Sequence, residues 1–249
     1  MRLRAEFRMP LLFAALLAAR GQGQVADSAG QAPLPPVEDI VAKMVAQGQW
    51  QDLSVRSYKV TRRFQASNAR FKVRAMLALR TQFHAPDFYE SVVLEQQGSR
   101  LIRQRVFDKI LEEERTAQPA KEKTSYDVLP DNYVFRVLGV EPCGDRKCFR
   151  LSLTPKRKDK FLLEGFVWVD TEDYAIAKVQ GSPSKRPSFW TLRTEVTRTY
   201  RRYGDVWMTD RIDSVSDLFV AGRSTLSIAY SYQNIEADHA GAVHSPESQ

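Results

Sequence analysis

The sequence predicts a mostly β (α+β) protein, built on one strongly curved antiparallel sheet of about ten strands with two helices. Three observations support this fold class. Most segments between residues 55 and 234 repeat apolar side chains every second residue, which is the period of a strand. Turn-forming residues separate these segments at hairpin spacing. Only residues 37–48 and 99–118 have a helical period, so both helices come early in the chain.

The N-terminus has the pattern of a secretory signal peptide. Arg2, Arg4 and Arg8 precede the apolar run Met9–Ala19, which is too short to span a bilayer as a mature helix. Small and polar residues follow this run. We therefore expect cleavage between Ala19 and Ala26 and export of the mature chain.

The predicted organisation has four parts: residues 1–26 as signal peptide and leader, 27–36 as a flexible linker, 37–235 as one folded domain, and 236–249 as a disordered tail. Removal of residues 1–26 takes away four Arg and one Glu, which lowers the formal charge from +7 to +4. A positive excess of this size suits solubility and does not indicate a dedicated nucleic-acid binder. We expect no nucleic-acid partner.

Each predicted helix has one apolar stripe. The first helix begins after Pro35 and Pro36, which suit a first turn, and Gly48 marks its expected end. Its stripe consists of Val37, Ile40, Val41, Met44 and Val45. The stripe of the second helix consists of Ile102, Val106, Phe107, Ile110 and Leu111. Both helices are amphipathic and need an apolar partner surface, so we expect them to pack on the sheet.

Three predicted strands lie between the helices. In the first strand, Tyr58, Val60 and Phe64 share one face with Arg62. In the second strand the shared face consists of Phe71, Val73, Ala75, Leu77 and Leu79, and the third strand covers Phe88–Glu95. Seven more strands are predicted after the second helix: Tyr133–Val140, Phe149–Thr154, Phe161–Asp170, Tyr174–Val179, Phe189–Tyr203, Val206–Val220 and Arg223–Gln233. Several of them exceed the usual strand length, which favours a curved sheet.

The predicted hairpin from Leu162 to Gly181 carries apolar groups on both faces. Phe166 and Trp168 alternate with Val167 and Val169, and successive side chains of a strand point to opposite sides. An antiparallel hairpin usually leaves one face to water, so apolar material is expected on each side of this one. Two interpretations account for the surplus of aromatic residues. One is a large dry core under the helices, and the other is a concave face that holds an apolar ligand.

The same hairpin contains three carboxylates, Asp170, Glu172 and Asp173, where its two strands reverse. Asp favours turns because its side chain accepts hydrogen bonds from nearby backbone amides, and no further metal ligand lies close in sequence. We therefore expect a turn.

Other catalytic residues are also not evident in the sequence. His84 is the only His outside the C-terminal tail, and residues 182–188 lack the spacing of a nucleophile elbow. The sequence thus predicts no enzyme and no catalytic, cofactor-binding or metal-binding residues.

Cys143 and Cys148 flank the four-residue loop GDRK between two predicted strands. In an exported protein such a pair is expected to form a structural disulfide. The closed loop is short, so we expect a gain of about 2–3 kcal/mol at best.

Basic residues cluster at Lys156, Arg157, Lys158 and Lys160. A charged turn between strands is ordinarily solvated. The alternative is a docking patch for anionic lipid headgroups or for an acidic partner. The sequence leaves both interpretations open.

Three motifs together resemble a known family. They are FHAPDFYE at Phe83–Glu90, the hairpin FLLEGFVWVDTEDY at Phe161–Tyr174, and PSFW at Pro187–Trp190. In this order, after an early helix, they resemble the periplasmic outer-membrane lipoprotein-sorting proteins, called LolA-like, whose fold is shared by sensor domains of the MucB/RseB type. The resemblance covers residues 37–235. It implies a half-open antiparallel barrel, or half-barrel, with helices lidding a concave side that takes up acyl chains.

One residue departs from the family pattern. The carriers typically place an Arg directly before the Pro of the strand turn, whereas this chain has Ala85 before Pro86. No cargo-gating Arg is therefore carried over to that position. Arg62 and Arg80 are the two residues that could take its place.

The resemblance implies a periplasmic carrier or binder of lipid or lipoprotein acyl chains, working with membrane-associated donor or acceptor proteins. The alternative is an envelope-stress sensor of the MucB/RseB type that binds a membrane-anchored partner, and an exported hydrolase is the least favoured class. The predicted lining consists of apolar and aromatic residues on the strands and turns: Tyr58, Val60, Phe64, Phe71, Val73, Leu77, Leu79, Phe166, Trp168, Trp190, Leu192, Val196, Leu226, Ile228 and Tyr230. Phe166 and Trp168 are expected on the same side as Trp190, Leu192, Leu226 and Ile228.

Overall fold

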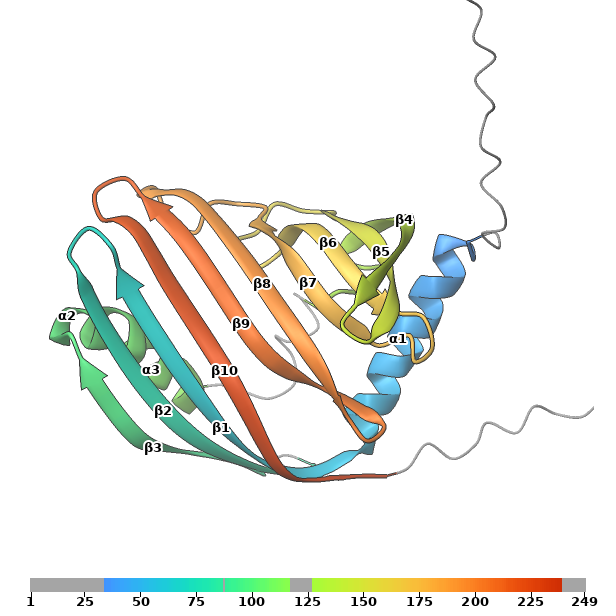
Figure 1. Ribbon diagram of the computed structural model, residues 1–249, viewed down its shortest axis with the longest axis horizontal. Helices are drawn as coiled ribbons and strands as arrows, with labels where there is room; N and C mark the ends of the chain where they lie inside the picture. The colour runs from blue at the N-terminus through green and yellow to red at the C-terminus, as the bar shows by residue number, and fades with distance from the viewer. Residues whose placement is uncertain (1–33, 87, 117–126, 239–249) are drawn as a thin grey trace, which may run out of the picture. The chain divides into compact units, whose positions relative to one another are not determined.

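The computed structural model describes residues 34–86, 88–116 and 127–238 (Figure 1). The predicted signal peptide, the linker up to residue 33 and the tail from residue 239 lie outside these residues. The helices are α1 (Val37–Ser54), α2 (Arg100–Ile102), the π-helical turn η1 (Arg103–Phe107) and α3 (Asp108–Thr116). Within the described residues, none of them combines the length and apolar character that a membrane-spanning helix needs.

Ten strands form one antiparallel sheet. They are β1 (Val55–Asn68), β2 (Val73–His84), β3 (Phe88–Gly98), β4 (Tyr133–Cys143), β5 (Arg146–Pro155), β6 (Leu163–Asp170), β7 (Ile176–Pro183), β8 (Thr191–Tyr203), β9 (Val206–Leu218) and β10 (Gly222–Ala237). Their order in the sheet is β3-β2-β1-β10-β9-β8-β7-β6-β5-β4. The sheet is curved and open, with β3 and β4 at its two edges (Figure 1). The predicted α+β half-barrel is confirmed.

Two meanders meet at one strand pair. Strands β4 to β10 follow one another as neighbours, and so do β1 to β3. The first and last strands of the sequence, β1 and β10, join the meanders, for example through the pair Phe64 and Ile228. This long-range pairing makes one continuous surface from strands that lie far apart in the chain.

Helix α1 packs on one half of the sheet. Its buried residues Ile40, Val41 and Met44 lie in a core cluster with Val167 and Val169 of β6 and with residues of β4, β5 and β7. The helix does not end at Gly48, as the sequence predicted, but continues to Ser54. The extension brings Trp50 against a second cluster that contains Val55, Val206 and Met208. This packing offsets the cost of a glycine inside a helix, which is about 1 kcal/mol.

The segment α2–η1–α3 packs on the other half of the sheet. Ile102 and Phe107 are buried against β1 and β2, and Val106, Ile110 and Leu111 pack beside them. The predicted apolar stripe of this segment is confirmed, although its middle is a π-helical turn. Because α1 and α3 both lie on the side of the sheet that carries Val167 and Phe64, we call this side the helix face and the opposite side the outer face.

Some strand ends differ from the prediction. Phe71 lies in the β1–β2 turn and Trp190 in the β7–β8 turn, because the ladders stop at Asn68 and start at Thr191. Strand β10 runs to Ala237, two residues beyond the predicted domain boundary. The Asp238 backbone N–H also donates to the carbonyl oxygen of Ser54 at 2.8 Å. The end of the sheet is thereby joined to the end of α1.

Candidate functional site

The helix face gathers most of the residues predicted to line a lipid site. Residues that pair across antiparallel strands point to the same side, so register fixes their placement. Phe64 pairs with Leu77 of β2 and with Ile228 of β10, and Arg62 pairs with Leu79 and Tyr230. The predicted residues on the helix face are Tyr58, Val60, Phe64, Val73, Leu77, Leu79, Val196, Leu226, Ile228 and Tyr230.

These residues divide into a dry core and a partly exposed group. Phe64, Leu77 and Leu79 are only 3%, 1% and 0% exposed, and they pack under Ile102 and Phe107. Their role is therefore packing. Val196, Leu226, Ile228 and Tyr230 are half-buried. Tyr58 and Val73 are also half-buried, whereas Val60 is only 4% exposed. The half-buried residues have surface left for contact with a ligand.

Strand β9 runs between the half-buried residues and adds members that the sequence had not singled out. Ile212 pairs with Ile228 of β10 and with Arg198 of β8, and Ser214 pairs with Leu226 and Val196. We define the central strip as Val196, Arg198, Ile212, Ser214, Leu226, Ile228 and Tyr230. Helix α1 packs on β4–β7 and the α2–α3 segment on β1–β2, so the central strip lies between the two helical covers (Figure 1).

Arg198 gives the central strip a positive charge. Its side chain is exposed, and it pairs with Val179 of β7 as well as with Ile212. The pKa of its guanidinium is raised, first by neighbouring Tyr200 and further by Tyr230 and Asp127. An Arg stays charged at any physiological pH, so the strip offers apolar surface and one permanent cation side by side.

Arg62 is a second arginine of the helix face, but it is only 8% exposed. It donates through Nη2 to the hydroxyl oxygen of Thr81 at 2.8 Å and to that of Ser91 at 3.3 Å. Arg80 pairs with Thr61 and is exposed on the outer face. Of the two candidates for the missing family Arg, only Arg62 reaches the helix face, where its contacts join β1, β2 and β3.

Aromatic rings gather on the helix face near the α1 end of β1. Tyr58 stacks on Phe83 at a centroid distance of 5.1 Å and meets the edge of Tyr232 at 5.6 Å. Tyr203 also meets Tyr232, at 5.5 Å, and these two rings help to line a hollow of about 470 Å³. Burial raises the pKa of Tyr232 well above its usual value, and Tyr58, Tyr230 and Tyr203 raise it further. The Tyr232 hydroxyl therefore remains neutral.

Phe166 and Trp168 do not face the central strip, so that part of the prediction is wrong. Trp168 pairs with Arg150 and Lys178, and Phe166 pairs with Ser152 and Gln180, all on the outer face. Their neighbours Val167 and Val169 take the helix face and are fully buried in the α1 core. The predicted alternation along β6 is confirmed, but the predicted face is wrong.

Charged side chains cover the two aromatic rings on the outer face. The Arg150 guanidinium carbon lies 4.1 Å from the ring centroid of Phe166, and Lys178 Nζ lies 4.3 Å from that of Trp168. Glu141 accepts from Trp168 Nε1 at 3.0 Å and from Arg150 Nη1 at 2.8 Å. Long basic side chains can shield apolar surface while their charged ends stay in water. This explains how a hairpin with two apolar faces avoids exposing either one.

Phe71, Trp190 and Leu192 are also absent from the central strip. Phe71 and Trp190 lie in turns, where they are 52% and 55% exposed. Leu192 is 54% exposed and is the extra residue at a register shift between Thr191 and Arg193. All three belong to the same end of the sheet.

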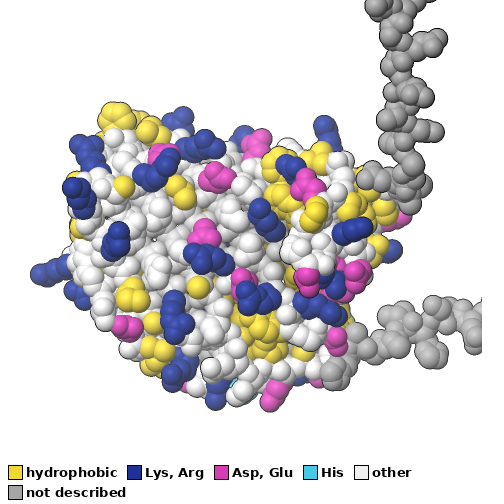
Figure 2. All heavy atoms as spheres, viewed as in Figure 1, with side chains coloured by type: hydrophobic (Ala, Val, Ile, Leu, Met, Phe, Trp, Pro, Cys, Tyr) yellow, Lys and Arg dark blue, Asp and Glu magenta, His cyan; other side chains and the backbone are white. Residues whose placement is uncertain are grey.

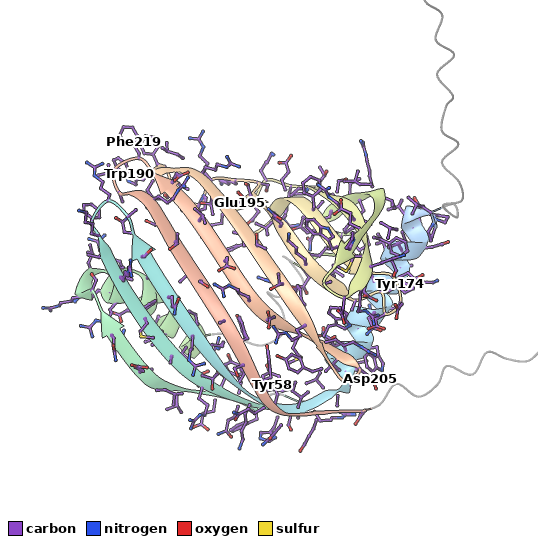
Figure 3. All side chains as sticks on the ribbon, viewed as in Figure 1. Tyr58, Tyr174, Trp190, Glu195, Asp205 and Phe219 are labelled. Atoms are coloured by element: carbon purple, nitrogen blue, oxygen red, sulfur yellow. A yellow bond between two sulfur atoms is a disulfide. The ribbon has the colours of Figure 1, made fainter. Side chains whose placement is uncertain are left out.

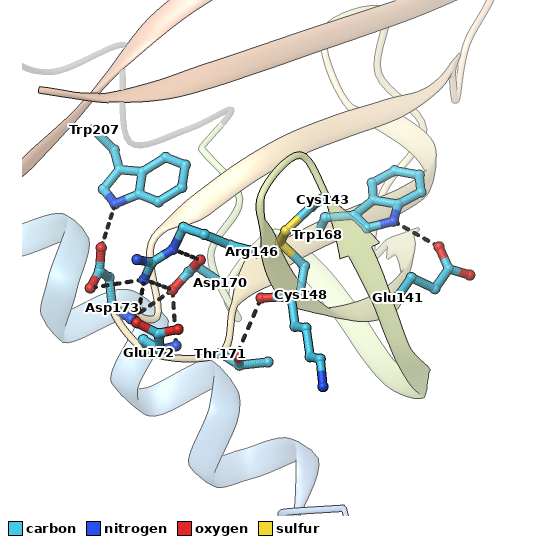
Figure 4. Close-up of a disulfide and its surroundings, with 11 residues drawn as sticks. Glu141, Cys143, Arg146, Cys148, Trp168, Asp170, Thr171, Glu172, Asp173 and Trp207 are labelled. Atoms are coloured by element: carbon cyan, nitrogen blue, oxygen red, sulfur yellow. Dashed lines mark hydrogen bonds and ion pairs between the residues drawn. A yellow bond between two sulfur atoms is a disulfide. The ribbon is translucent and has the colours of Figure 1, made fainter.

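The carboxylate cluster is a turn, as the sequence predicted, and it is held by one arginine. Asp170 is fully buried and accepts from Arg146 through both carboxylate oxygens at 2.6 Å. Backbone N–H groups of Glu172 and Asp173 donate to Asp170 at 2.9 and 2.8 Å, and Trp207 Nε1 donates to Asp173 at 2.9 Å (Figure 4). These hydrogen bonds occupy acceptor positions of the Asp170 and Asp173 carboxylates that a substrate would otherwise use.

Cys143 and Cys148 form the predicted disulfide, with Cα atoms 5.9 Å apart. The two residues are not direct partners across the hairpin, because Cys148 pairs with Glu141 and Cys143 with Arg146. They occupy diagonal positions on the outer face. The sulfur atoms and a carboxylate oxygen of Asp170 lie within 4.8 Å of one another. The disulfide removes both thiolates and Arg146 occupies the carboxylate, so this group lacks the free ligands that a metal ion requires.

Comparisons with known proteins found solved structures of low similarity to this chain. No known family profile matches the sequence, and no curated protein sequence matches it. A DUF1329 family protein from Desulfovibrio piger is similar in structure, with 13% identity, a TM-score of 0.40, and coverage of 82% of this chain and 94% of that one.

A putative outer membrane lipoprotein-sorting protein domain from Vibrio parahaemolyticus has 14% identity and a TM-score of 0.39, over 79% of this chain and 92% of its own. A LolA superfamily protein from Nitrosomonas europaea has 12% identity and a TM-score of 0.35, over 84% and 96%. Both are named for the family that the sequence motifs resemble. One fold carries many functions, so what this chain binds has to follow from its own residues.

Proposed function

We propose that this protein binds the acyl chains of lipids or lipoproteins on the helix face of its sheet, as a periplasmic carrier or binder. The observation that carries the proposal is the half-buried apolar surface of Val196, Ile212, Leu226 and Ile228 between the two helical covers. Leu79 and Val167 on the same face of the sheet are fully buried. The partial exposure is thus a property of the central strip and not of the whole face.

Apolar surface of this kind favours a flexible apolar ligand. Burial of each methylene group contributes about 0.8 kcal/mol, so a long acyl chain gains affinity over an extended strip without needing a closed pocket. The ring cluster of Tyr58, Phe83 and Tyr232 continues the apolar surface toward the α1 end of β1. The two regions together suit a ligand that is long and narrow.

Arg198 extends the proposal to the polar end of the ligand. The Arg198 side chain stands beside Ile212, and guanidinium groups bind carboxylates and phosphates through paired hydrogen bonds. An amphiphile could therefore place its acyl chain along Ile212 and Ile228 and its anionic group at Arg198. This supports a lipid and not a purely apolar ligand.

A binding role fits the polar clusters better than hydrolysis does. Asp170 and Asp173 are engaged by Arg146 and Trp207, and Glu141 by Arg150 and Trp168. Activity as a hydrolase would need a nucleophile or a base directed at a ligand.

The proposed periplasmic location rests on the Arg-flanked apolar run at residues 2–20. A mature N-terminus between residues 20 and 27, found in protein from the cell envelope, would support it.

The direct test is to extract lipids from the mature protein after purification from the cell envelope without detergent and to identify them by mass spectrometry. Acyl lipids in near-equal amount to the protein are the expected result. Protein that retains no lipid, and that takes up none from vesicles, would contradict the proposal.

A second candidate function is that of a sensor that binds a membrane-anchored partner, and the edge strand β3 favours it. Strand β3 is exposed along most of its length, and Phe88, Val92 and Val93 are 50%, 51% and 46% exposed. A sheet edge can accept an extended segment of another chain as an added strand. Capture of a partner segment along β3 that changes when lipid is added would support the sensor, whereas lipid uptake without such a partner would support the carrier.

A further inference from the structure

Four hairpin turns line one end of the sheet. They are the β1–β2 turn (69–72), the β9–β10 turn (219–221), the β7–β8 turn (184–190) and the β5–β6 turn (156–162). Each turn joins two adjacent strands, and the four pairs follow one another in the sheet order. Strands lie about 4.8 Å apart, so neighbouring turns are spaced by about 10 Å. We call these four turns the turn rim.

Each turn of the rim exposes a phenylalanine. Phe71, Phe219, Phe189 and Phe161 are 52%, 69%, 86% and 54% exposed. Trp190 and Val220 are 55% and 54% exposed beside them. Phe219 and Trp190 lie together at one end of the sheet, and Asp205 and Tyr174 lie at the other (Figure 3). Large apolar side chains repeated in this way on successive turns mark an interaction surface.

Hydrogen bonds between the turns hold these side chains as a set. Arg70 donates to the carbonyl oxygen of Val220 at 2.7 Å, which joins the first two turns. The Phe219 N–H donates to the carbonyl oxygen of Trp190 at 2.9 Å, which joins the next two. The Ser184 N–H donates to Leu162 at 2.7 Å and completes the series. The exposed rings therefore sit on a connected rim and not on independent loops.

The turn rim is also strongly basic. It contains eight Lys or Arg residues and one acidic residue, Asp159; the basic residues are Arg70, Lys72, Lys156, Arg157, Lys158, Lys160, Lys185 and Arg186, and all eight are exposed. The described turns at the opposite end, residues 144–145, 171–175 and 204–205, contain four acidic residues and no Lys or Arg. Figure 2 shows hydrophobic side chains beside Lys and Arg at the end where β9 and β10 turn. At the opposite end, Arg146 and Arg202 pair with three of the four acidic residues, Glu172, Asp173 and Asp205, whereas the turn rim keeps an excess of basic residues.

We propose that the turn rim docks on the surface of an anionic lipid bilayer, with its aromatic side chains at the boundary between headgroups and acyl chains. Aromatic rings favour this boundary, and each Lys or Arg near an anionic surface adds to the attraction. The rings are spread over an arc of about 30 Å, set by the spacing of four turns. A broad bilayer surface can meet all of them at once, whereas a protein partner usually concentrates its strongest contacts in one central patch.

The sequence left open whether the basic turn Lys156–Lys160 is only solvated or forms a docking patch, and the proposed surface assigns it to docking. Arg157 donates to Asn132 at 2.6 Å, and Lys158 Nζ lies 3.4 Å from Glu164. Lys160 lies over the ring of Phe161 at 4.7 Å. The turn adds one exposed ring and four of the eight basic residues to the proposed lipid-docking surface. The Lys185 N–H donates to the carbonyl oxygen of Asp159 at 3.2 Å and joins this turn to the β7–β8 turn. The proposal goes beyond the ligand of the central strip and does not depend on it.

The test measures co-sedimentation of the mature protein with vesicles of phosphatidylcholine alone and of an equimolar mixture with phosphatidylglycerol. The wild type is expected to bind the mixture and not phosphatidylcholine alone. The double variant Phe189→Ser with Phe219→Ser should bind at least about tenfold more weakly, because two rings are no longer buried in the bilayer. Its matched control is Val134→Ser with Leu138→Ser, which removes apolar residues of similar exposure (48% and 53%) from β4 and should bind as the wild type does.

Two further measurements distinguish the electrostatic attraction of the basic residues from insertion of the aromatic rings into the bilayer. Lys185→Glu with Arg186→Glu should abolish binding to the mixed vesicles at moderate salt. The fluorescence of Trp190, which is 55% exposed, should shift to the blue on these vesicles, and Trp190→Phe should remove the shift. Wild-type protein that fails to bind, or rim variants that bind unchanged, would overturn the proposal. All rim variants should keep the wild-type affinity for a fatty-acid probe, so failure of docking and failure of acyl binding are distinguishable.

Discussion

Arg146 donates two hydrogen bonds of 2.6 Å to the fully buried carboxylate of Asp170, and this pair joins the β4–β5 hairpin to the β6–β7 turn. The same guanidinium lies 3.2 Å from Glu172 and from Asp173. Asp173 in turn accepts from Trp207 of β9 and pairs with Arg202 of β8 at 3.0 Å. One arginine thus organises the acidic end of the sheet.

Substitution of Asp170→Asn is expected to lower the free energy of unfolding by about 3 kcal/mol, because it leaves the Arg146 charge without its buried partner. Urea unfolding measures this change. Glu172→Gln is the matched control, since Glu172 is 69% exposed and its pair with Arg146 is screened by water. A loss of unfolding free energy in Asp170→Asn that is no larger than the loss in Glu172→Gln would contradict a stabilising role of the buried pair.

The pH dependence of stability follows from the same carboxylate. Burial alone would raise the pKa of Asp170, but the Arg146 hydrogen bonds and the N–H groups of Asp173 and Glu172 outweigh burial and lower it. A lowered folded pKa stabilises the protein above the unfolded value, and this stability is lost as pH falls. Wild-type protein should therefore lose stability below about pH 4 more steeply than Asp170→Asn. Parallel acid profiles of the two proteins would contradict this assignment.

Substitution of Trp168→Ala is expected to cost about 3 kcal/mol of stability and to leave acyl affinity unchanged, because this ring is 8% exposed on the outer face. Val167→Ala, in the α1 core, should also lose stability and keep affinity. Thermal unfolding and titration with a fluorescent fatty acid measure the two properties. A Trp168→Ala protein that is stable but binds the probe weakly would place this ring at the ligand.

These two residues show what the sequence could and could not predict. Their alternation, the strand order along the chain and the turn at Asp170 followed from local patterns. The choice of face did not, because Val167 and Trp168 are both apolar and the period of two is the same for either face. Contact with α1, which lies far away in sequence, decides it. The long basic side chains of Arg150 and Lys178 on the paired strands were the signal for the outer face.

The candidate site was predictable in part for the same reason. Leu226 and Ile228 were found by their alternation in a long strand. Arg198 and Ile212 were missed, because neither stands out in its own strand and only the pairing of β8 with β9 brings them together. The end of α1 was missed as well, since packing of Trp50 overrides the glycine at position 48.

Removal of the disulfide by the double substitution Cys143→Ala and Cys148→Ala is expected to lower the free energy of unfolding by about 2 kcal/mol, because the closed loop is short. The fold should survive, since the side chain at position 148 keeps the apolar neighbours Trp168 and Trp207. Circular dichroism and urea unfolding check both points. Loss of the folded state would show that the disulfide does more than close a small loop.

Tyr232 is expected to make stability fall at alkaline pH. Its folded pKa is raised, chiefly by burial, so its contribution is complete below the unfolded pKa of about 10 and is lost as pH rises above that value. Tyr232→Phe should remove part of this dependence, because phenylalanine does not ionise. Unfolding free energies at about pH 8 and about pH 11 measure the difference. An unchanged alkaline profile in the variant would assign the loss to other groups.

Acyl binding on the helix face can be tested by titrating a fluorescent fatty acid into two variants of strand β9, Ile212→Asn and Val215→Asn. Ile212 lies on the helix face in the central strip, and Val215 lies three residues away on the outer face, where it pairs with Thr225. Both side chains keep partial exposure, so both variants should fold. Burial of a branched side chain contributes about 1.5–3 kcal/mol, so Ile212→Asn should weaken the probe about tenfold or more. Val215→Asn should bind as the wild type does. Equal affinity of the two variants, or stronger loss at Val215, would contradict acyl binding on the helix face.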